Sequence, residues 1–232
     1  MHKKMIVDRR FCEIAEKKWG SFAEIIPSYK NENLPEQVAS HPDLSVCRVE
    51  DIYVCEKEAY QYYKKFIPEE KIICGETTLL SNYPFDIAYN VLISEKNAMA
   101  NFKYTDPVLK DVLVKKGFRL IDINQGYAAC SSAAFAGGII TSDPSVISAC
   151  KKNEIDVLEI EKGEVELKGY DYGFIGGASG YVSQKLLFFG DILWHSNYTK
   201  IKGFLSDKKI EYDYIENFPL TDVGTIIGIE LK

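Results

Sequence analysis

The sequence predicts a mixed α/β protein built as a ring of five strand–strand–helix–strand units. A repeated spacing and a repeated order of elements predict this architecture. Five polar or glycine-rich loops recur about every 45 residues, which is in the range typical of propellers and solenoids. The loops are centred on Asp43, Ala88, Cys130, Ile175 and Asp222.

Each loop precedes an apolar, hairpin-like stretch, which predicts the first two strands of a unit. Short apolar runs bounded by turn residues are typical of buried strands. The five stretches are LSVCRVEDIYV (44–54), VLISEKNAMANF (91–102), AAFAGGIIT (133–141), YVSQKLLFFGDILW (181–194) and TIIGIEL (225–231).

A helix and a returning strand complete each unit. An Asp cap followed by Pro marks a helix start, as in Asp106-Pro107 and Asp143-Pro144. Two more helices are expected to begin near Glu56 and Asn197. The returning strands are KIICG (71–75), FRLIDIN (118–124), IDVLEIE (155–161) and YDYIE (212–216).

The two ends of the sequence together supply the fifth unit. The strand MIVD (5–8), the helix FCEIAEKKWG (11–20) and the strand AEIIP (23–27) provide what TIIGIELK at the C-terminus lacks. Pairing of the two ends would close the ring, remove exposed sheet edges and make residues 1–232 a single domain. The alternative is an open α/β sheet in which the repeats are accidental.

Composition narrows the classes of partner. The net charge is −6 and the sequence has no long run of Lys or Arg, so we do not expect nucleic acid as a partner. No segment has the apolar length of a secretory signal or a membrane span, so we expect a cytoplasmic protein with a small-molecule partner. The six cysteines include no Cys-x-x-Cys pair and the three histidines are scattered, so we expect free thiols, no metal and no cofactor.

The stretch GYDYGFIGGASG (169–180) has the glycine content of a phosphate-binding loop. A phosphate loop requires a helix directly behind it, because the ligand binds the free N–H groups at the helix start. The residues that follow, YVSQKLLFF, predict a strand instead. We therefore interpret this stretch as a turn of the repeated architecture.

Five strand–strand–helix–strand units around an axis resemble the pentein fold of the guanidino-group-modifying enzymes. The stretches HPDLSV, QGYAAC, IITSD, GYDYGFIGGASG, FFGDILWH and PLTDVG also resemble an uncharacterised bacterial family, common in clostridia, that is assigned to this fold. The resemblance covers nearly the whole chain. It implies a pocket on the axis, in which the enzymes use a Cys nucleophile, a His acid/base and carboxylates that hold a guanidinium.

The enzymes' catalytic positions are not matched in this sequence. The nucleophile's place falls on LTDVG (220–224) and the histidine's place on GYAAC (126–130). No cysteine follows Cys150, and GYAACSS contains no histidine. The resemblance therefore supports the fold and leaves the activity open.

Polar residues nevertheless gather in the five loops, where a ring would bring them together. The candidate catalytic residues are Cys130, His41 and Asp222, and the candidate ligand-binding residues are Asp43, Asp86, Asn90, Gln125, Asp171 and Tyr172. Three hypotheses follow: an enzyme, a small-molecule binder or a non-catalytic interaction protein. A reactive thiol would favour the enzyme, and an inert thiol beside an anionic pocket would favour the small-molecule binder. An axis filled by side chains, together with an apolar patch on the outer surface, would favour the interaction protein.

Two simpler interpretations remain beside these hypotheses. Each loop residue taken alone is typical of a turn, as in His-Pro-Asp and Asp-Val-Gly. His195 ends an expected strand just before a helix, so we expect it to pack or hydrogen-bond locally.

Overall fold

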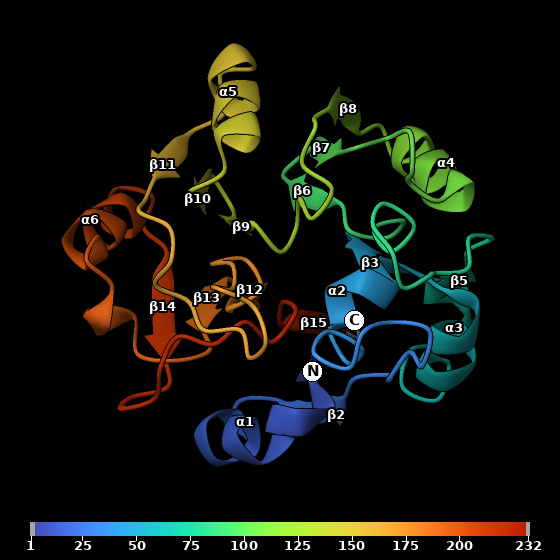
Figure 1. Ribbon diagram of the computed structural model, residues 1–232, viewed down its shortest axis with the longest axis horizontal. Helices are drawn as coiled ribbons and strands as arrows, with labels where there is room; N and C mark the ends of the chain where they lie inside the picture. Colours follow the sequence, from blue (N-terminus) through green and yellow to red (C-terminus); the bar gives the residue numbers. More distant parts are fainter. Residues whose placement is uncertain (1–2, 231–232) are drawn as a thin grey trace.

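The structure is a computed structural model that describes residues 3–230. It contains five three-stranded sheets set around a central axis, with most helices on the outside of the ring (Figure 1). This arrangement confirms the predicted ring of five units and contradicts the open sheet. None of the helices within the described residues is both long and apolar enough to cross a membrane.

The strands follow the same order in every sheet, from the axis outward. The sheets are β15 (Ile227–Glu230), β1 (Lys3–Val7) and β2 (Glu24–Pro27); β3 (Val46–Val49), β4 (Ile52–Cys55) and β5 (Ile72–Cys74); β6 (Leu92–Ser94), β7 (Asn97–Ala100) and β8 (Arg119–Asp122); β9 (Ser132–Phe135), β10 (Gly138–Thr141) and β11 (Val157–Glu159); and β12 (Ser179–Val182), β13 (Lys185–Phe188) and β14 (Glu211–Tyr214).

Within each sheet the inner strand pairs antiparallel with the middle strand, and the outer strand pairs parallel with the middle one. A parallel pair requires a crossover connection, and a helix supplies it in every unit. These helices are α1 (Cys12–Trp19), α3 (Lys57–Tyr63), α4 (Pro107–Lys115), α5 (Pro144–Lys152) and α6 (Tyr198–Asp207).

The expected helix starts are present. The Asp106 carboxylate accepts a hydrogen bond from Leu109 N, and the Asp143 carboxylate accepts one from Val146 N. A proline at the first helical position follows each of these caps. The helices pack their apolar faces on the sheets, as where Leu205 of α6 joins a buried cluster with Phe188 of β13.

The two ends of the chain close the ring, as predicted. Strand β15 pairs antiparallel with β1, with Lys3 opposite Glu230 and Ile6 opposite Ile227. Strand β1 lies between β15 and β2, so the first and last strands belong to one sheet.

The five inner strands run in the same sense along the axis and define its two ends. We call the side of the five polar loops the loop end; these loops lead into β3, β6, β9, β12 and β15. The other side is the turn end, where hairpin turns such as Glu50-Asp51 and Glu95-Lys96 join inner strands to middle strands.

Two segments differ from the sequence-based prediction. The strand expected from Leu44 is preceded by a single helical turn, α2 (Pro42–Ser45), which Pro42 starts at its first position. The hairpin expected over residues 181–194 is present as β12 and β13 but ends at Phe188. It is followed by the 3₁₀ turn Ile192–Trp194, because the Asp191 carboxylate accepts a hydrogen bond from Leu193 N.

His195 and the glycine-rich stretch have the structural roles that the sequence indicated. The His195 Nδ1 atom accepts a hydrogen bond from Asn197 N at 3.1 Å, just before α6. Residues 169–178 lead directly into β12, with no helix behind them.

Candidate functional site

A buried hydrogen-bonded cluster joins three of the loops at the loop end. Asp43 lies on α2, Cys130 precedes β9 and Thr225 precedes β15. The Cys130 thiol donates to Asp43 Oδ2 at 2.9 Å, and the Thr225 hydroxyl donates to the same oxygen at 2.7 Å. Asp43 and Cys130 are only 3% and 4% exposed. Side chains from distant parts of the sequence therefore meet on the axis.

Asn90, from the loop before β6, fixes the position of this cluster. Its amide nitrogen donates to Cys130 Sγ at 3.0 Å and to the Asp43 carbonyl at 3.3 Å, and its amide oxygen accepts from Ala129 N at 2.8 Å. Every polar atom of the Asn90 side chain is thus used within the protein. Asn90 consequently orients Asp43 and Cys130 and has no free group for a ligand.

The second carboxylate oxygen of Asp43, Oδ1, has no hydrogen-bond partner among the described residues. Burial raises the pKa of Asp43, and the hydrogen bonds from Cys130 and Thr225 partly oppose that shift. Buried polar atoms in folded proteins are almost always paired, so an unpaired carboxylate oxygen at a cavity indicates a place for a donor.

The surroundings of the Cys130 thiol oppose formation of its thiolate. Burial, followed by the nearby charge of Asp43, raises its pKa well above the ordinary value. The thiolate is the nucleophilic form of cysteine, so a raised pKa opposes nucleophilic catalysis. Cys130 serves here as a hydrogen-bond donor to Asp43.

His41 and Asp222 lie side by side next to this cluster. His41 Nδ1 is 3.7 Å from Asp222 Oδ1, too long for a hydrogen bond. The Asp222 carboxylate instead accepts from Phe174 N at 2.9 Å and from Gly224 N at 3.0 Å, which ties two loops together. Both side chains are 2% exposed.

Burial shifts the two groups in opposite directions. It lowers the pKa of His41 to about 3, so the imidazole is neutral at physiological pH. Burial and the charge of Asp43 raise the pKa of Asp222 to about 7. A neutral His41 cannot supply the positive charge that would activate Cys130.

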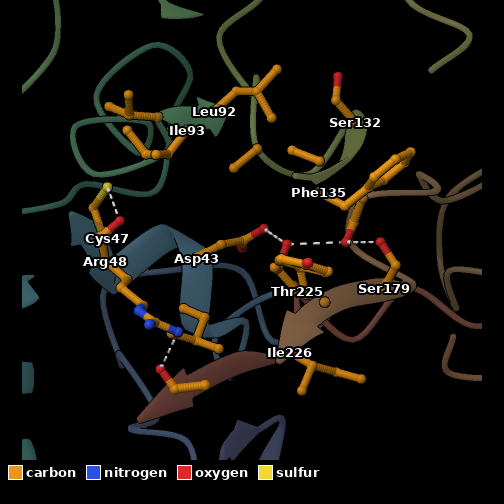
Figure 2. Close-up of a pocket in the computed structure, with 18 of the residues that line it drawn as sticks. Asp43, Cys47, Arg48, Leu92, Ile93, Ser132, Phe135, Ser179, Thr225 and Ile226 are labelled. Atoms are coloured by element: carbon orange, nitrogen blue, oxygen red, sulfur yellow. Dashed lines mark hydrogen bonds between the residues drawn. The ribbon is translucent and has the colours of Figure 1, made fainter. Parts of the chain in front are cut away.

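A cavity of about 430 Å³ extends from this cluster along the axis toward the turn end. Asp43 and Thr225 contribute to its closed, loop-end floor, and the exposed residues Glu50 and Glu95 contribute to its rim at the turn end. Figure 2 shows the Asp43 side chain reaching from α2 toward the middle of the cavity, where Thr225 meets it. The cavity walls are formed by the inner strands.

The other candidate ligand-binding residues do not line this cavity. Asp86 accepts a hydrogen bond from the Tyr127 hydroxyl at 2.5 Å, and Gln125 donates to the Asp143 carboxylate at 2.5 Å. Both contacts are local links between loops. The remaining two candidates, Asp171 and Tyr172, are exposed and lie outside the cavity lining.

Asp43 is the one sequence-based candidate that lines the cavity; Thr225, Arg48 and Glu95 are among the lining residues that the sequence did not indicate. Thr225 is a β-branched residue with a φ of 65°, a left-handed conformation that is rare for such residues. Arg48, in strand β3, and Glu95, in a hairpin turn, look like ordinary strand and turn residues in the sequence. The only sequence signal for this group was the position of Thr225 directly after Asp222-Val223-Gly224.

The described residues contain no group of three or more His, Cys, Asp or Glu side chains placed to hold a metal ion. Asp43 has one unpaired carboxylate oxygen, Oδ1, and its other oxygen, Oδ2, accepts hydrogen bonds from Cys130 and Thr225. This arrangement can accept a hydrogen bond from a bound N–H group.

The ring of five units defines a pentein-like fold, and solved structures of similar fold agree with this assignment. One of these structures is the dimethylarginine dimethylaminohydrolase of Pseudomonas aeruginosa, a cysteine-to-serine variant in complex with citrulline. It superposes with a TM-score of 0.56 at 9% identity, over 93% of this chain and 92% of that one. A histidine-to-glycine variant of a dimethylarginine dimethylaminohydrolase, as an adduct with S-methyl-L-thiocitrulline, gives a TM-score of 0.53 at 9% identity, over 93% of each chain.

The chain belongs to the family of unknown function DUF6873, whose profile matches residues 6–227. No curated protein matches the sequence. The similarity to the two solved structures confirms the resemblance to pentein proteins at the level of the fold.

Proposed function

We propose that this protein binds a small molecule bearing a guanidinium or ammonium group in the axial cavity, with Asp43 as the anchor. The observation that carries the proposal is the unpaired, buried Oδ1 atom of Asp43, a residue that lines the cavity. A cationic N–H donor would satisfy this oxygen, and hydrogen bonds to charged groups are among the stronger ones in proteins.

Binding without covalent turnover at Cys130 fits the electrostatics of the loop end. A cysteine nucleophile needs a lowered pKa, whereas burial and Asp43 raise the pKa of Cys130. One solved structure of similar fold is in complex with citrulline, whose side chain ends in an uncharged ureido group. The cationic ligand class therefore rests on Asp43 itself.

The test is a titration with methylguanidine, using methylurea as an uncharged probe of similar shape. We expect methylguanidine to raise the melting temperature and to bind measurably by calorimetry, and methylurea to do neither. Asp43→Asn should weaken methylguanidine binding by about 10- to 100-fold, because the new amide nitrogen would face the cation instead of a carboxylate oxygen.

Asp171→Asn is the matched control, because Asp171 is an exposed aspartate outside the cavity. It should leave methylguanidine affinity unchanged. Equal binding to the wild type and Asp43→Asn, or equal binding of methylguanidine and methylurea, would contradict the proposal.

A non-catalytic interaction protein is the second candidate. It is favoured by exposed aromatic and aliphatic side chains on two of the connecting loops: Leu80, Tyr83, Phe85 and Tyr170 are each at least half exposed. Tyr83 packs against Tyr127 with ring centroids 5.7 Å apart, which gives this surface an ordered base. On this alternative, no cation would stabilise the wild type and Asp43→Asn would behave like the wild type toward every probe.

A further inference from the structure

The axial cavity is polar at its two ends and largely apolar between them. Its walls include Ile93, Ala134 and Tyr181, partly exposed side chains from three different inner strands. The cavity residues labelled in Figure 2 include Ile93. Such walls suit the methylene groups of an alkyl chain, each of which would tighten binding by about fourfold when buried.

The rim of the cavity carries three carboxylates at the turn end: Glu50, Glu95 and Glu230. Glu50 forms an ion pair with Lys96 at 2.6 Å, and Glu230 forms one with Arg48 at 3.1 Å. Glu95 forms no ion pair with any residue in the range 3–230. One rim carboxylate is therefore available to a bound cation.

Arg48, the basic residue of the cavity lining, is already engaged. Its Nε atom donates to the Glu50 carbonyl at 2.7 Å and its Nη1 atom donates to the Gly228 carbonyl at 3.1 Å. Its Nη2 atom forms the ion pair with Glu230. Arg48 thus links β3 to β15 across the rim, and a ligand carboxylate would have to displace these contacts to bind it.

The distance between the two ends suits a short linear molecule. The inner strand β3 has four residues between the floor residue Asp43 and the rim residue Glu50. At about 3.3 Å per residue the two ends are separated by roughly 10–15 Å. A chain of a few methylenes with hydrogen bonds at both termini spans such a length.

The geometry points to a linear dication, an α,ω-diamine or its guanidino equivalent, as the ligand class. One charged end binds Asp43 Oδ1 at the buried floor, the alkyl chain lies against the apolar walls, and the second charged end lies beside Glu95 at the rim. This inference rests on the proposed function, because it assumes that Asp43 anchors a cation.

The experiment compares three probes of equal chain length: hexamethylenediamine, hexylamine and ε-aminocaproate. Calorimetry at low salt should show hexamethylenediamine binding about four- to tenfold tighter than hexylamine. This is the two- to fivefold expected for an exposed ion pair multiplied by about twofold for the two equivalent ends of the diamine. The aminocaproate should bind more weakly than either, because its carboxylate would lie beside Glu95. Putrescine and cadaverine then report whether affinity depends on chain length.

Glu95→Gln should reduce hexamethylenediamine affinity to within about twofold of that of hexylamine, the factor left by its two equivalent ends, and should leave hexylamine affinity unchanged. Glu154→Gln is the control, since Glu154 is an exposed glutamate with a φ of 57°, close to the 52° of Glu95, and lies outside the cavity. It should change neither affinity.

The outcomes separate the two proposals. If hexylamine and hexamethylenediamine bind within about twofold of each other and both lose affinity in Asp43→Asn, the dication is wrong and the proposed function stands. Tighter binding of ε-aminocaproate than of hexamethylenediamine would also overturn the dication, with Arg48 as the receptor of the carboxylate. If none of the amines or methylguanidine binds, the proposed function itself fails.

Discussion

The titratable residues at the two ends of the axis differ in their exposure to solvent. At the loop end, Asp43, His41 and Asp222 are buried. At the turn end, Glu50 and Glu95 are exposed. The same five inner strands connect both ends, so the difference arises from the segments that join the strands.

The loop end is closed because its loops are long and pack on one another. The connection between β2 and α2 contributes Leu34 and Ala39 to the same buried cluster as Cys130. At the turn end, tight hairpin turns join the inner strands β3, β6, β9 and β12 to their middle strands, and these turns are too short to reach across the axis. Burial shifts pKa values strongly at the closed end, whereas solvent screens the charges at the open end. On the proposed function, a buried charge would recognise the ligand at the floor of the cavity.

Deleting residues 220–232 should have the largest effect, because it removes a part of both ends together. The deletion takes away Asp222 and Thr225 at the loop end and the whole of β15, which leaves one edge of β1 unpaired. We expect an insoluble or molten product without a cooperative thermal transition. Circular dichroism melting would show this, and a truncated protein that melts cooperatively near the full-length temperature would contradict ring closure.

Alkylation of the cysteines tests the closure of the loop end. Native Cys130 should react with iodoacetamide at least about 100-fold more slowly than in the denatured chain, because its thiol is buried and its pKa is raised. The partly exposed Cys12 and Cys74 should react first. Peptide mass spectrometry over time measures each site. Fastest labelling at Cys130 would instead favour the enzyme hypothesis.

A glycine substitution at the loop end should be costly, and one at the periphery should not. A Cβ on Gly177 would overlap the Asp222 carboxylate and break the contacts that tie two loops together. We expect Gly177→Ala to lower the free energy of unfolding by about 1–3 kcal/mol. Gly203→Ala, inside α6 with open space around it, should raise that free energy by about 0.5–1 kcal/mol. Denaturant titration measures both, and equal effects would contradict tight packing at the loop end.

The pH dependence of stability should reveal the opposed shifts of Asp222 and His41. The pKa of Asp222 rises on folding from 3.8 to about 7, so its contribution is full at low pH and is lost as pH rises through this window. The pKa of His41 falls on folding from 6.5 to about 3, so its contribution is full above 6.5 and is lost as pH falls. Between about pH 4 and 6.5 the two contributions oppose each other.

Single substitutions should separate these two contributions. Asp222→Asn should make the free energy of unfolding rise more steeply with pH in this window, and His41→Gln should make it fall, each by about 1 kcal/mol per pH unit. Urea unfolding at a series of pH values measures the slopes. Unchanged slopes in both variants would show that neither group titrates differently in the folded state.

Most of the fold was predictable because it depends on local signals. Asp106-Pro107 and Asp143-Pro144 fix helix starts by short-range hydrogen bonding, and those caps are present. Ring closure followed from the repeat and from the incomplete units at the two ends. The 3₁₀ turn at Ile192–Trp194 was missed because Asp191 binds Asn217 N, 26 residues further along the chain, as well as its neighbour Leu193.

The candidate site was predictable only in part. The loop repeat correctly brought Asp43, Asn90 and Cys130 together, since all three precede inner strands. It could not show that Asp171 points to solvent or that the cavity opens at the turn end. Which end is open depends on packing between distant segments, such as Leu34 against the cluster of Cys130, and periodicity carries no such information.

The pairing of β1 with β15 also sets the order in which the fold can be completed on the ribosome. Of the strands in this ring, β1 is synthesised first. Its partner β2 follows closely, but its other partner, β15, is separated from it by the four remaining sheets. Until Ile227–Glu230 is available, β1 presents an unpaired edge that other strands could extend. Nascent chains should therefore gain their final resistance to protease abruptly, when the last strand leaves the exit tunnel, and not in five equal steps.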